Sequence, residues 1–266
     1  MKRIHVTGCP RSGTTLLAEM MRTCFRCDGA NEHETSVLNP VPAGATTWIT
    51  KLPGELDLLA RLMPLDDRLH AVYIERDPRS VITSIHSAAA GRYATDYKSW
   101  SECHHKALTL APESRFISLR YEELVRSPDK AQDALLAAFP WLEKKESFAN
   151  YHRAASASRE SLVAMNGLRQ VSTDRVDSWR KHLPRIKEEL VRHPEMLKDI
   201  IESGYEPDAS WADVLRDIPF QQHAVWRSSP PSLLKRFDRW QRRQRKLRRF
   251  IRAAKQRRAM QTSTTG

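Results

Sequence analysis

The fold is decided by a stretch near the N-terminus, His5-Val-Thr-Gly-Cys-Pro-Arg-Ser-Gly-Thr-Thr-Leu-Leu17. Apolar residues favour a short buried strand over Ile4 to Thr7, and those of Thr14 to Phe25 have the spacing of a helix. A glycine loop between a strand and a helix is typical of phosphate-binding sites, because the first N–H groups of the helix face the anion. The loop of NTPases has a lysine after its second glycine, whereas here Thr14 follows Gly13.

A second candidate anion site lies at the end of the most strand-like segment, His70 to Glu75. Arg76 follows this strand directly, and Ser84 is expected about two turns into the helix that starts at Pro78. Open α/β sheets bind ligands at the carboxyl ends of their strands, so both side chains could address one anion. The alternative interpretation is a solvated turn at Arg76 and a local backbone cap at Ser84.

Strands alternate with helices along the chain. Further strands are expected at Thr46 to Thr50 and Arg115 to Leu119, and further helices at Pro128 to Phe139 (with Ser127 as a candidate N-cap), Arg175 to His182, Pro184 to Arg192 and Pro194 to Glu202. This alternation predicts a parallel sheet with helices on both faces. The expected fold class is therefore α/β, a three-layer sandwich with a central parallel sheet, a P-loop-like anion-binding loop and a helical C-terminal part.

The positive charge of the chain is concentrated near its C-terminus. The net charge is +12, from 44 Lys+Arg and 32 Asp+Glu. Residues 233–258 contain 13 of the basic residues and one acid, so the rest of the chain is neutral. Apolar residues recur there every three or four positions, which predicts a basic amphipathic helix. We therefore divide the chain into a domain at 1–228 and a basic helical tail at 229–266.

The two candidate anion sites together resemble the sulfotransferase family, whose members use 3′-phosphoadenosine 5′-phosphosulfate (PAPS). Pro10-Arg-Ser-Gly-Thr-Thr15 is similar to the family's 5′-phosphosulfate loop, and Arg76 with Ser84 is similar to its 3′-phosphate site. Weaker similarities follow in the family's order, at Thr50 to Pro53, Arg120 to Val125 and Ser172 to Trp179. The motifs are closest to those of the tyrosylprotein, Golgi-type and bacterial glycan branch.

The resemblance implies that PAPS is the co-substrate and that no metal ion is required. A sulfuryl group carries less charge than a phosphoryl group, so an NTPase lysine is not expected. The resemblance places the donor on Pro10, Arg11, Ser12, Gly13, Thr14, Thr15, Arg76, Ser84, Tyr121, Ser172 and Arg175. Arg11 would neutralise the leaving 5′-phosphate, and Lys51 would point at the transferring group. Tyr121 would lie beside the adenine, with Trp179 as a further stacking residue.

A general base must take the proton of the acceptor. The segment Asn31-Glu-His-Glu-Thr35 follows the first helix, where this branch of the family often has a catalytic glutamate. Glu34 is the favoured candidate because Glu34-Thr35 is most similar to the family's pair. Glu32 has the more usual distance from Thr15, and His33 lies between the two glutamates, so both stay as alternatives.

The acceptor is expected to be a hydroxyl or amine compound, with a glycan or glycolipid favoured and the loops Ala88 to Ser101 and Tyr151 to Arg169 forming its pocket. No apolar run approaches the roughly 18 to 20 residues of a membrane span, and no secretory segment is recognisable. We expect a cytoplasmic protein, with the tail as an optional attachment to the inner membrane face. The alternatives are a polyanion- or membrane-binding protein acting through its tail, with nucleic acid the less favoured ligand, and a P-loop kinase, which the missing lysine disfavours.

Overall fold

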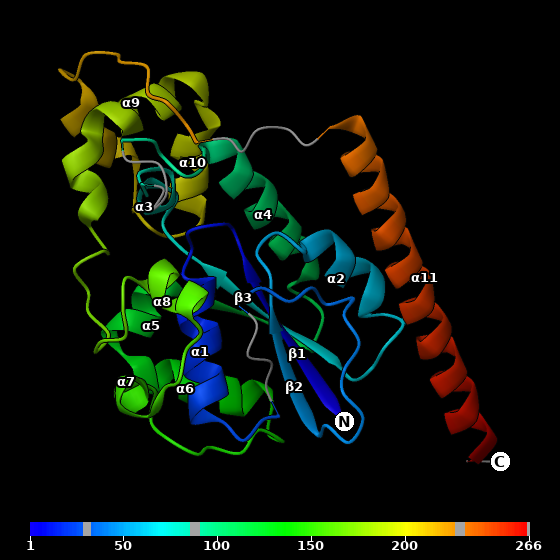
Figure 1. Ribbon diagram of the computed structural model, residues 1–266. Coiled ribbons are helices and arrows are strands. Elements are labelled where there is room, and N and C mark those ends of the chain that lie inside the picture. Colours follow the sequence, from blue (N-terminus) through cyan, green and yellow to red (C-terminus); the bar gives the residue numbers. More distant parts are fainter. Residues whose placement is uncertain (29–32, 86–90, 227–231, 265–266) are drawn as a thin grey trace.

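A computed structural model of the chain describes residues 1–28, 33–85, 91–226 and 232–264 (Figure 1). In these residues a four-stranded parallel sheet has the order β2-β1-β3-β4. Its strands are β1 (Lys2–Gly8), β2 (Thr47–Lys51), β3 (Leu69–Glu75) and β4 (Phe116–Arg120). The predicted parallel sheet and the predicted strands are confirmed.

Helices cover both faces of the sheet and make three layers (Figure 1). The α-helices are α1 (Thr14–Cys24), α2 (Leu56–Leu62), α3 (Pro78–Ile82), α4 (Tyr97–Leu110), α5 (Tyr121–Arg126), α6 (Pro128–Ala138), α7 (Tyr151–Ala154), α8 (Arg159–Met165), α9 (Leu183–Arg192), α10 (Glu195–Glu202) and α11 (Leu233–Thr264). The short 3₁₀ helices are η1 (Phe148–Asn150), η2 (Ser178–His182) and η3 (Ala209–Leu215). The expected α/β class is therefore confirmed.

The sheet separates two apolar cores because successive side chains of a strand point to opposite faces. On β3, Val72 and Ile74 face the core formed with α1, α5 and α6. Ala71 and Tyr73 face the other core, formed with α2, α4 and parts of α9 to α11. Burial of these two cores supplies the hydrophobic driving force of the fold.

The four strands run in the same direction, so their carboxyl ends meet at one edge. Val6 pairs with Lys51, Gly8 with Ile74, and Glu75 with Arg120. The residues that follow each strand are therefore neighbours in space although they lie far apart in the sequence. This edge carries the candidate site.

The prediction that Ser84 lies two turns into a helix is wrong. Asp77 caps α3 by accepting from Arg79 N, with Pro78 in the first turn as expected. The helix ends at Ile82. After it, Thr83 Oγ1 donates to the Arg79 carbonyl at 2.7 Å, and Ser84 N donates to the Val81 carbonyl at 3.1 Å. Ser84 therefore lies after the helix and not within it.

Three further expectations differ from the structure in detail. Ser127 occupies the N-cap position of α6 without a side-chain hydrogen bond. The helix expected from Arg175 is a 3₁₀ helix that begins at Ser178. Part of the expected acceptor loop, 88–101, is instead the first turns of α4, which begins at Tyr97, while residues 86–90 lie outside the described residues.

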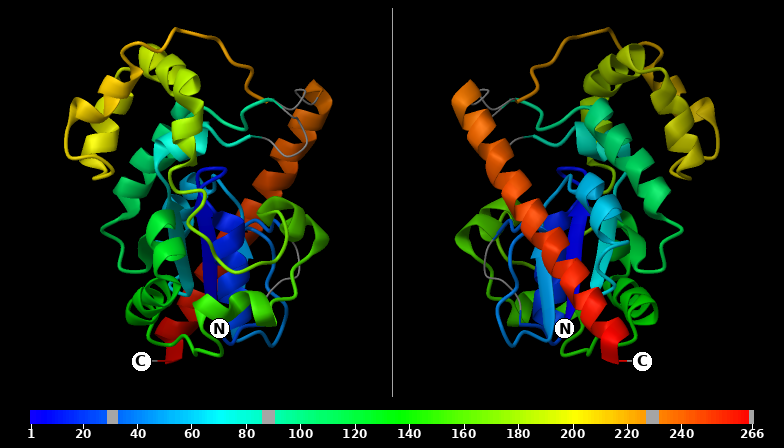
Figure 2. Two further views of the ribbon diagram at one scale, coloured as in Figure 1. Left: turned by 90° about the vertical axis from the view of Figure 1, so that its left-hand side faces the viewer. Right: turned by 90° about the vertical axis from the view of Figure 1, so that its right-hand side faces the viewer.

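The second half of α11 packs on the domain. Leu247, Phe250 and Ala254 are buried in the same core as α2 and α4. Phe250 lies under the guanidinium of Arg3, 5.1 Å from its ring centroid, and Arg257 pairs with Asp66 at 2.9 Å. Figure 2 shows α11 crossing the molecule diagonally on the α2 side. The expected amphipathic helix is present, and the expected boundary at 228/229 lies outside the described residues.

No helix in the described ranges combines the length and the apolar composition needed to cross a bilayer.

Replacing Phe250 with alanine should lower the free energy of unfolding by about 3 kcal/mol, because the lost ring leaves a cavity between α11 and β1. The control is Phe237→Ala on the same helix, whose side chain is 55% exposed and whose loss should change stability by no more than about 0.5 kcal/mol. Urea denaturation measures both. Equal, small effects would mean that α11 is not docked in solution.

Candidate functional site

The loop between β1 and α1 is shaped by two glycines. A Cβ atom on Gly8 would lie 2.5 Å from Ser12 Oγ and 2.6 Å from the Ile74 carbonyl oxygen. Gly13 has a φ of 102°, and a Cβ there would lie 2.6 Å from the Tyr121 ring. Gly13 occupies the N-cap position of α1. Because glycine has no side chain, it offers no hydrogen-bond acceptor to the first N–H groups of the helix. The loop therefore forms a cradle for an anion.

Arg76 connects three separate parts of the chain at the end of β3. Its Nη1 donates to the Arg11 carbonyl at 3.1 Å, and its Nη2 donates to the Arg175 carbonyl at 2.7 Å. The guanidinium lies over the ring of Tyr121, 4.3 Å from the centroid. Its Nε is buried and has no hydrogen-bond partner among the described residues. Arg76 thus has donor capacity left for a ligand.

Arg11 lies between the loop and the residue that follows α3. Its Nε donates to Ser84 Oγ at 2.8 Å. Burial lowers the pKa of Arg11, and the positive charges of Arg175 and Arg76 lower it further. These guanidinium groups repel one another, and an anion bound among them would relieve the repulsion.

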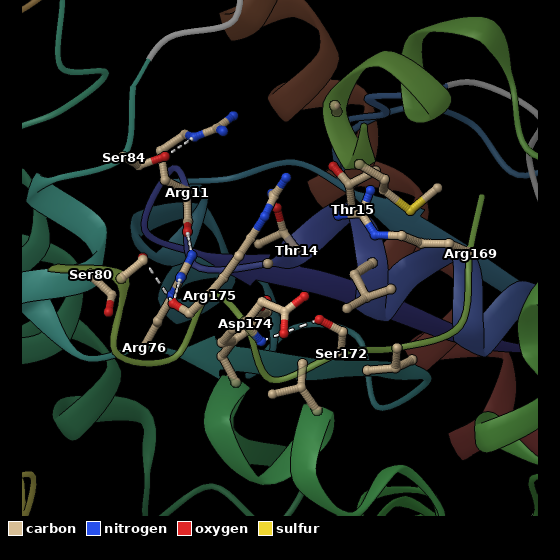
Figure 3. A pocket seen from close by; sticks show the side chains of 18 of the residues that line it. Arg11, Thr14, Thr15, Arg76, Ser80, Ser84, Arg169, Ser172, Asp174 and Arg175 are labelled. Atoms are coloured by element: carbon tan, nitrogen blue, oxygen red, sulfur yellow. Dashed lines mark hydrogen bonds between the residues drawn. The ribbon is translucent and has the colours of Figure 1, made fainter. Parts of the chain in front are cut away.

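A cavity of about 460 Å³ opens beside these arginines. Figure 3 shows the loop and α1 on one side of it and the segment 169–175 on the other, with Arg169 and Arg175 extending towards Thr15 and Thr14. Most of the predicted donor residues line this cavity, namely Arg11, Gly13, Thr14, Thr15, Arg76, Ser84, Tyr121, Ser172 and Arg175. The structure thus brings together residues from five separate segments of the sequence.

Two predicted donor residues do not line the cavity. The side chain of Pro10 is exposed. Ser12 is buried beneath the loop, where its amide donates to the Cys9 carbonyl at 3.1 Å, and its Oγ has no partner within the described part of the chain. Both residues shape the loop around Gly8 and Gly13. Their direct contact with a donor stays a prediction.

Several residues of the cavity wall were missed by sequence reasoning. They are Ser80, Thr83, Arg169, Gln170, Asp174 and His182. Arg169 belongs to the segment that was assigned to the acceptor pocket. The only sequence signal for its place at the cavity is that it is a single cation shortly after Gly167. The amide of Asp174 donates to Ser172 Oγ at 3.2 Å, so this hydroxyl is already engaged in a turn.

Lys51 ends β2 next to the first turn of α1. Its Nζ donates to Thr15 Oγ1 and to Glu34 Oε1, both at 3.3 Å. The lysine side chain is 1% exposed, whereas that of Glu34 is 46% exposed. Burial lowers the pKa of Lys51, and Glu34 acts in the opposite direction. Thr35 N donates to the Lys51 carbonyl at 2.8 Å, which fixes the segment that carries Glu34 beside the cavity.

The alternative bases differ in their surroundings. His33 Nδ1 lies 3.0 Å from Ser161 Oγ on α8, and Ser161 donates in turn to Glu19 of α1 at 2.8 Å. Burial lowers the pKa of His33, and the charge of Lys51 lowers it further. Both His33 and Glu34 are therefore near Lys51, while Glu32 lies outside the described residues.

Trp179 is part of the core and does not line the cavity. It is 1% exposed. The guanidinium groups of Arg79 and Arg180 lie 4.1 Å and 4.5 Å from a ring centroid of Trp179. The expectation that Trp179 stacks on the donor is not supported, and Tyr121 is the predicted aromatic that reaches the cavity.

Comparison with known proteins identifies one family. Residues 33–141, less than half of the chain, match the sulfotransferase family, which confirms the resemblance seen in the sequence. The matched range includes Glu34, Lys51, Arg76, Ser84 and Tyr121 but not the glycine loop. No curated protein sequence matches the chain.

Three solved structures are similar to the chain at low identity. The sulfotransferase domain of the Synechococcus PCC 7002 olefin synthase is 17% identical, with a TM-score of 0.49, over 68% of this chain and 87% of that domain. A mouse sulfotransferase complexed with PAP is 14% identical, with a TM-score of 0.47, over 82% and 89%. Retinol dehydratase, in complex with androsterone and the inactive cofactor PAP, is 14% identical, with a TM-score of 0.42, over 76% and 82%.

The geometry of the loop predicts different costs for two glycine substitutions. Gly13→Ala should cost about 1–3 kcal/mol more stability than Gly44→Ala, because the new methyl group meets the Tyr121 ring. Gly44 is the matched control, since it also has a positive φ (84°) but no atom within 4 Å of an added Cβ. Chemical denaturation of the two variants measures the difference, and equal costs would contradict the close packing of the loop on Tyr121.

Proposed function

We propose that this chain, whose residues 33–141 match the sulfotransferase family, transfers a sulfuryl group from PAPS to a hydroxyl acceptor. The observation that carries the proposal is the cavity at the carboxyl edge of the sheet. There, Arg11, Arg76 and Arg175 gather beside the N-terminus of α1, and Lys51 and Glu34 lie next to Thr15. An amine, which the sequence also allows, is the alternative acceptor within this proposal.

The residues present fit a nucleotide with two anionic ends. A volume of about 460 Å³ is in the range of nucleotide-sized pockets. The loop and α1 offer backbone N–H groups and two threonine hydroxyls to one anion, and Arg76 and Ser84 offer a guanidinium and a hydroxyl to the other. Tyr121 supplies an aromatic face at the cavity wall, with Leu16, Val125 and Val171 as apolar neighbours. The free donor capacity of Arg76 Nε supports the same assignment.

In the proposed reaction PAPS supplies the sulfuryl group, whose sulfur bonds to the acceptor oxygen as the 5′-phosphate leaves. The chain's own task is to position and to stabilise charge. Arg11 and the N-terminus of α1 hold the negative charge that develops on the leaving phosphate. Lys51, buried between Thr15 and Glu34, donates to the transferring group. Glu34 takes the proton of the acceptor hydroxyl.

The partial exposure of Glu34 supports a bulky acceptor. Its carboxylate is 46% exposed, so a substrate too large for the donor cavity can still approach the base from outside. We therefore propose a glycan or glycolipid hydroxyl as the acceptor. A glycolipid would require the protein to lie at a membrane surface. The cytoplasmic location and the independence from metal ions stay predictions.

The P-loop kinase is the second candidate for the loop itself. It would need a cation in place of the missing lysine and a magnesium site. The described residues contain no group of three or more His, Cys, Asp or Glu side chains placed to hold a metal. The kinase is tested by the same titration as the donor.

The protein should bind adenosine 3′,5′-bisphosphate in EDTA more tightly than it binds ATP with magnesium. Arg11→Ala should weaken bisphosphate binding roughly 10- to 100-fold, the value of one or two charge-assisted hydrogen bonds. Arg180→Ala, an exposed arginine outside the cavity, is the matched control and should bind normally. Isothermal titration calorimetry measures the affinity of the unchanged protein for both ligands and of the two variants for the bisphosphate. Tight binding of magnesium ATP alone would assign the loop to a phosphoryl enzyme.

Glu34→Gln should lower the turnover number by ~100-fold or more, the usual contribution of a general base, and should leave bisphosphate affinity unchanged. Turnover is followed with radiolabelled PAPS and an acceptor taken from a screen of glycans and glycolipids. Glu32→Gln and His33→Gln are measured beside it. If one of these two loses the activity while Glu34→Gln retains it, the role of base passes to that residue.

A further inference from the structure

The first half of α11 exposes an apolar patch. Leu233, Leu234, Phe237 and Trp240 are 78%, 79%, 55% and 57% exposed. Leu233, Phe237 and Trp240 are spaced four and three residues apart and share one face of the helix. The rings of Phe237 and Trp240 stack with centroids 5.9 Å apart. We call these four residues the α11 patch. Such a concentration of large exposed apolar side chains is typical of an interaction site.

Positive charges surround the α11 patch. Between residues 235 and 246 the helix contains one acid, Asp238, and seven cations that are all exposed: Lys235, Arg236, Arg239, Arg242, Arg243, Arg245 and Lys246. A helix that combines an exposed apolar face with a row of lysine and arginine residues has the composition of helices that lie in the interface of anionic bilayers.

The α11 patch is held in a fixed place by the docked half of the helix. Leu247 and Phe250 are buried in the domain core. Lys246 Nζ donates to Asn39 Oδ1 at 2.7 Å, and Asn39 lies in the segment that continues from Glu34. The exposed half is therefore continuous with a docked half, and Lys246 at their junction contacts Asn39, which follows Glu34 in the sequence.

We propose that the α11 patch binds the surface of an anionic lipid bilayer. Phe237 and Trp240 insert at the level of the headgroups, and the flanking cations, among them Arg239 and Arg242, pair with anionic headgroups. This binding requires no change in the domain and does not depend on the sulfotransferase reaction. If the reaction is as proposed, membrane binding would also bring lipid-linked acceptors close to the protein.

Charge and shape favour a bilayer over the other partners that such a helix could have. A second copy of the chain would bring the same row of cations against itself, since a two-fold interface pairs identical surfaces. A nucleic acid would satisfy the cations, but it offers no apolar phase for Leu233 and Leu234. A bilayer with anionic lipids satisfies both the apolar and the cationic side chains.

The test is co-sedimentation of the full chain with phospholipid vesicles. Vesicles of phosphatidylcholine mixed with phosphatidylglycerol should bind the protein. Vesicles of phosphatidylcholine alone should bind it with an affinity that is lower by roughly tenfold or more. The double variant Phe237→Ser/Trp240→Ser should lose roughly tenfold or more in affinity for the anionic vesicles. Phe220→Ser is the matched control, because Phe220 is 48% exposed but lies outside α11, and it should bind as the unchanged protein does.

The charges are tested by Lys235→Gln/Arg239→Gln/Arg242→Gln. This variant keeps four of the seven exposed cations, so it should bind anionic vesicles roughly tenfold or more weakly than the unchanged protein while its binding to neutral vesicles stays the same. Circular dichroism and bisphosphate binding confirm that each variant is folded. Equal binding of the unchanged protein to both vesicles, or undiminished binding of the Phe237→Ser/Trp240→Ser protein, would overturn the proposal. So would a dimer, seen by light scattering, that this double variant dissociates without any vesicle binding. The proposal would also be overturned if the protein bound an oligonucleotide more tightly than anionic vesicles and if both the serine and the glutamine variants kept that binding.

Discussion

The candidate site depends on the position of Arg76. This side chain is buried at the end of β3, and it donates to backbone carbonyls of the loop after β1 and of the segment before η2. It also lies over Tyr121, the first residue after β4. Removing such a cation from water is costly, and the carbonyl acceptors and the aromatic face offset the cost. The Arg76 guanidinium is therefore held in a fixed position near those of Arg11 and Arg175. Such a preorganised group of cations is suited to binding and stabilising an anion.

The parallel sheet is what makes this arrangement possible. The glycine loop, Arg76 and Tyr121 follow three of the strands, and Lys51 is the last residue of the fourth. The parallel register puts all four strand ends at one edge. The helices between the strands supply the two cores, and α1, α3 and α5 bring their first turns to this edge, where Thr14, Ser80 and Tyr121 line the cavity. Part of the remaining wall is the segment 169–175, which no strand positions. It is held in part by the hydrogen bond between Arg76 and the Arg175 carbonyl, so one residue both shapes the site and closes it.

The sequence predicted the parts of the site that depend on local pattern and missed those that depend on tertiary contacts. The glycine spacing and the strand before Arg76 were enough to predict that the loop and Arg76 lie at the carboxyl ends of neighbouring strands, where both line one cavity. Helix α4 was missed, and one reason is that its buried face includes His104, a polar residue that interrupts the apolar pattern. His104 is buried since its ring stacks on Trp100 at 4.7 Å and its Nδ1 lies 2.6 Å from Glu75. Arg169 could not be predicted, because only the fold brings it to the cavity.

The docked half of α11 stabilises the helical structure of the exposed half. A helix of ten or so residues is marginally stable in water by itself, so the exposed half would lose helical structure if it were free. The docked half, anchored by Phe250 and by the pair of Arg257 and Asp66, continues directly into it and removes the cost of nucleation. Phe237 and Trp240 are therefore presented on an already formed helix. A surface that binds them gains their burial without having to order the chain, which makes the binding of a short basic segment more favourable than its length suggests.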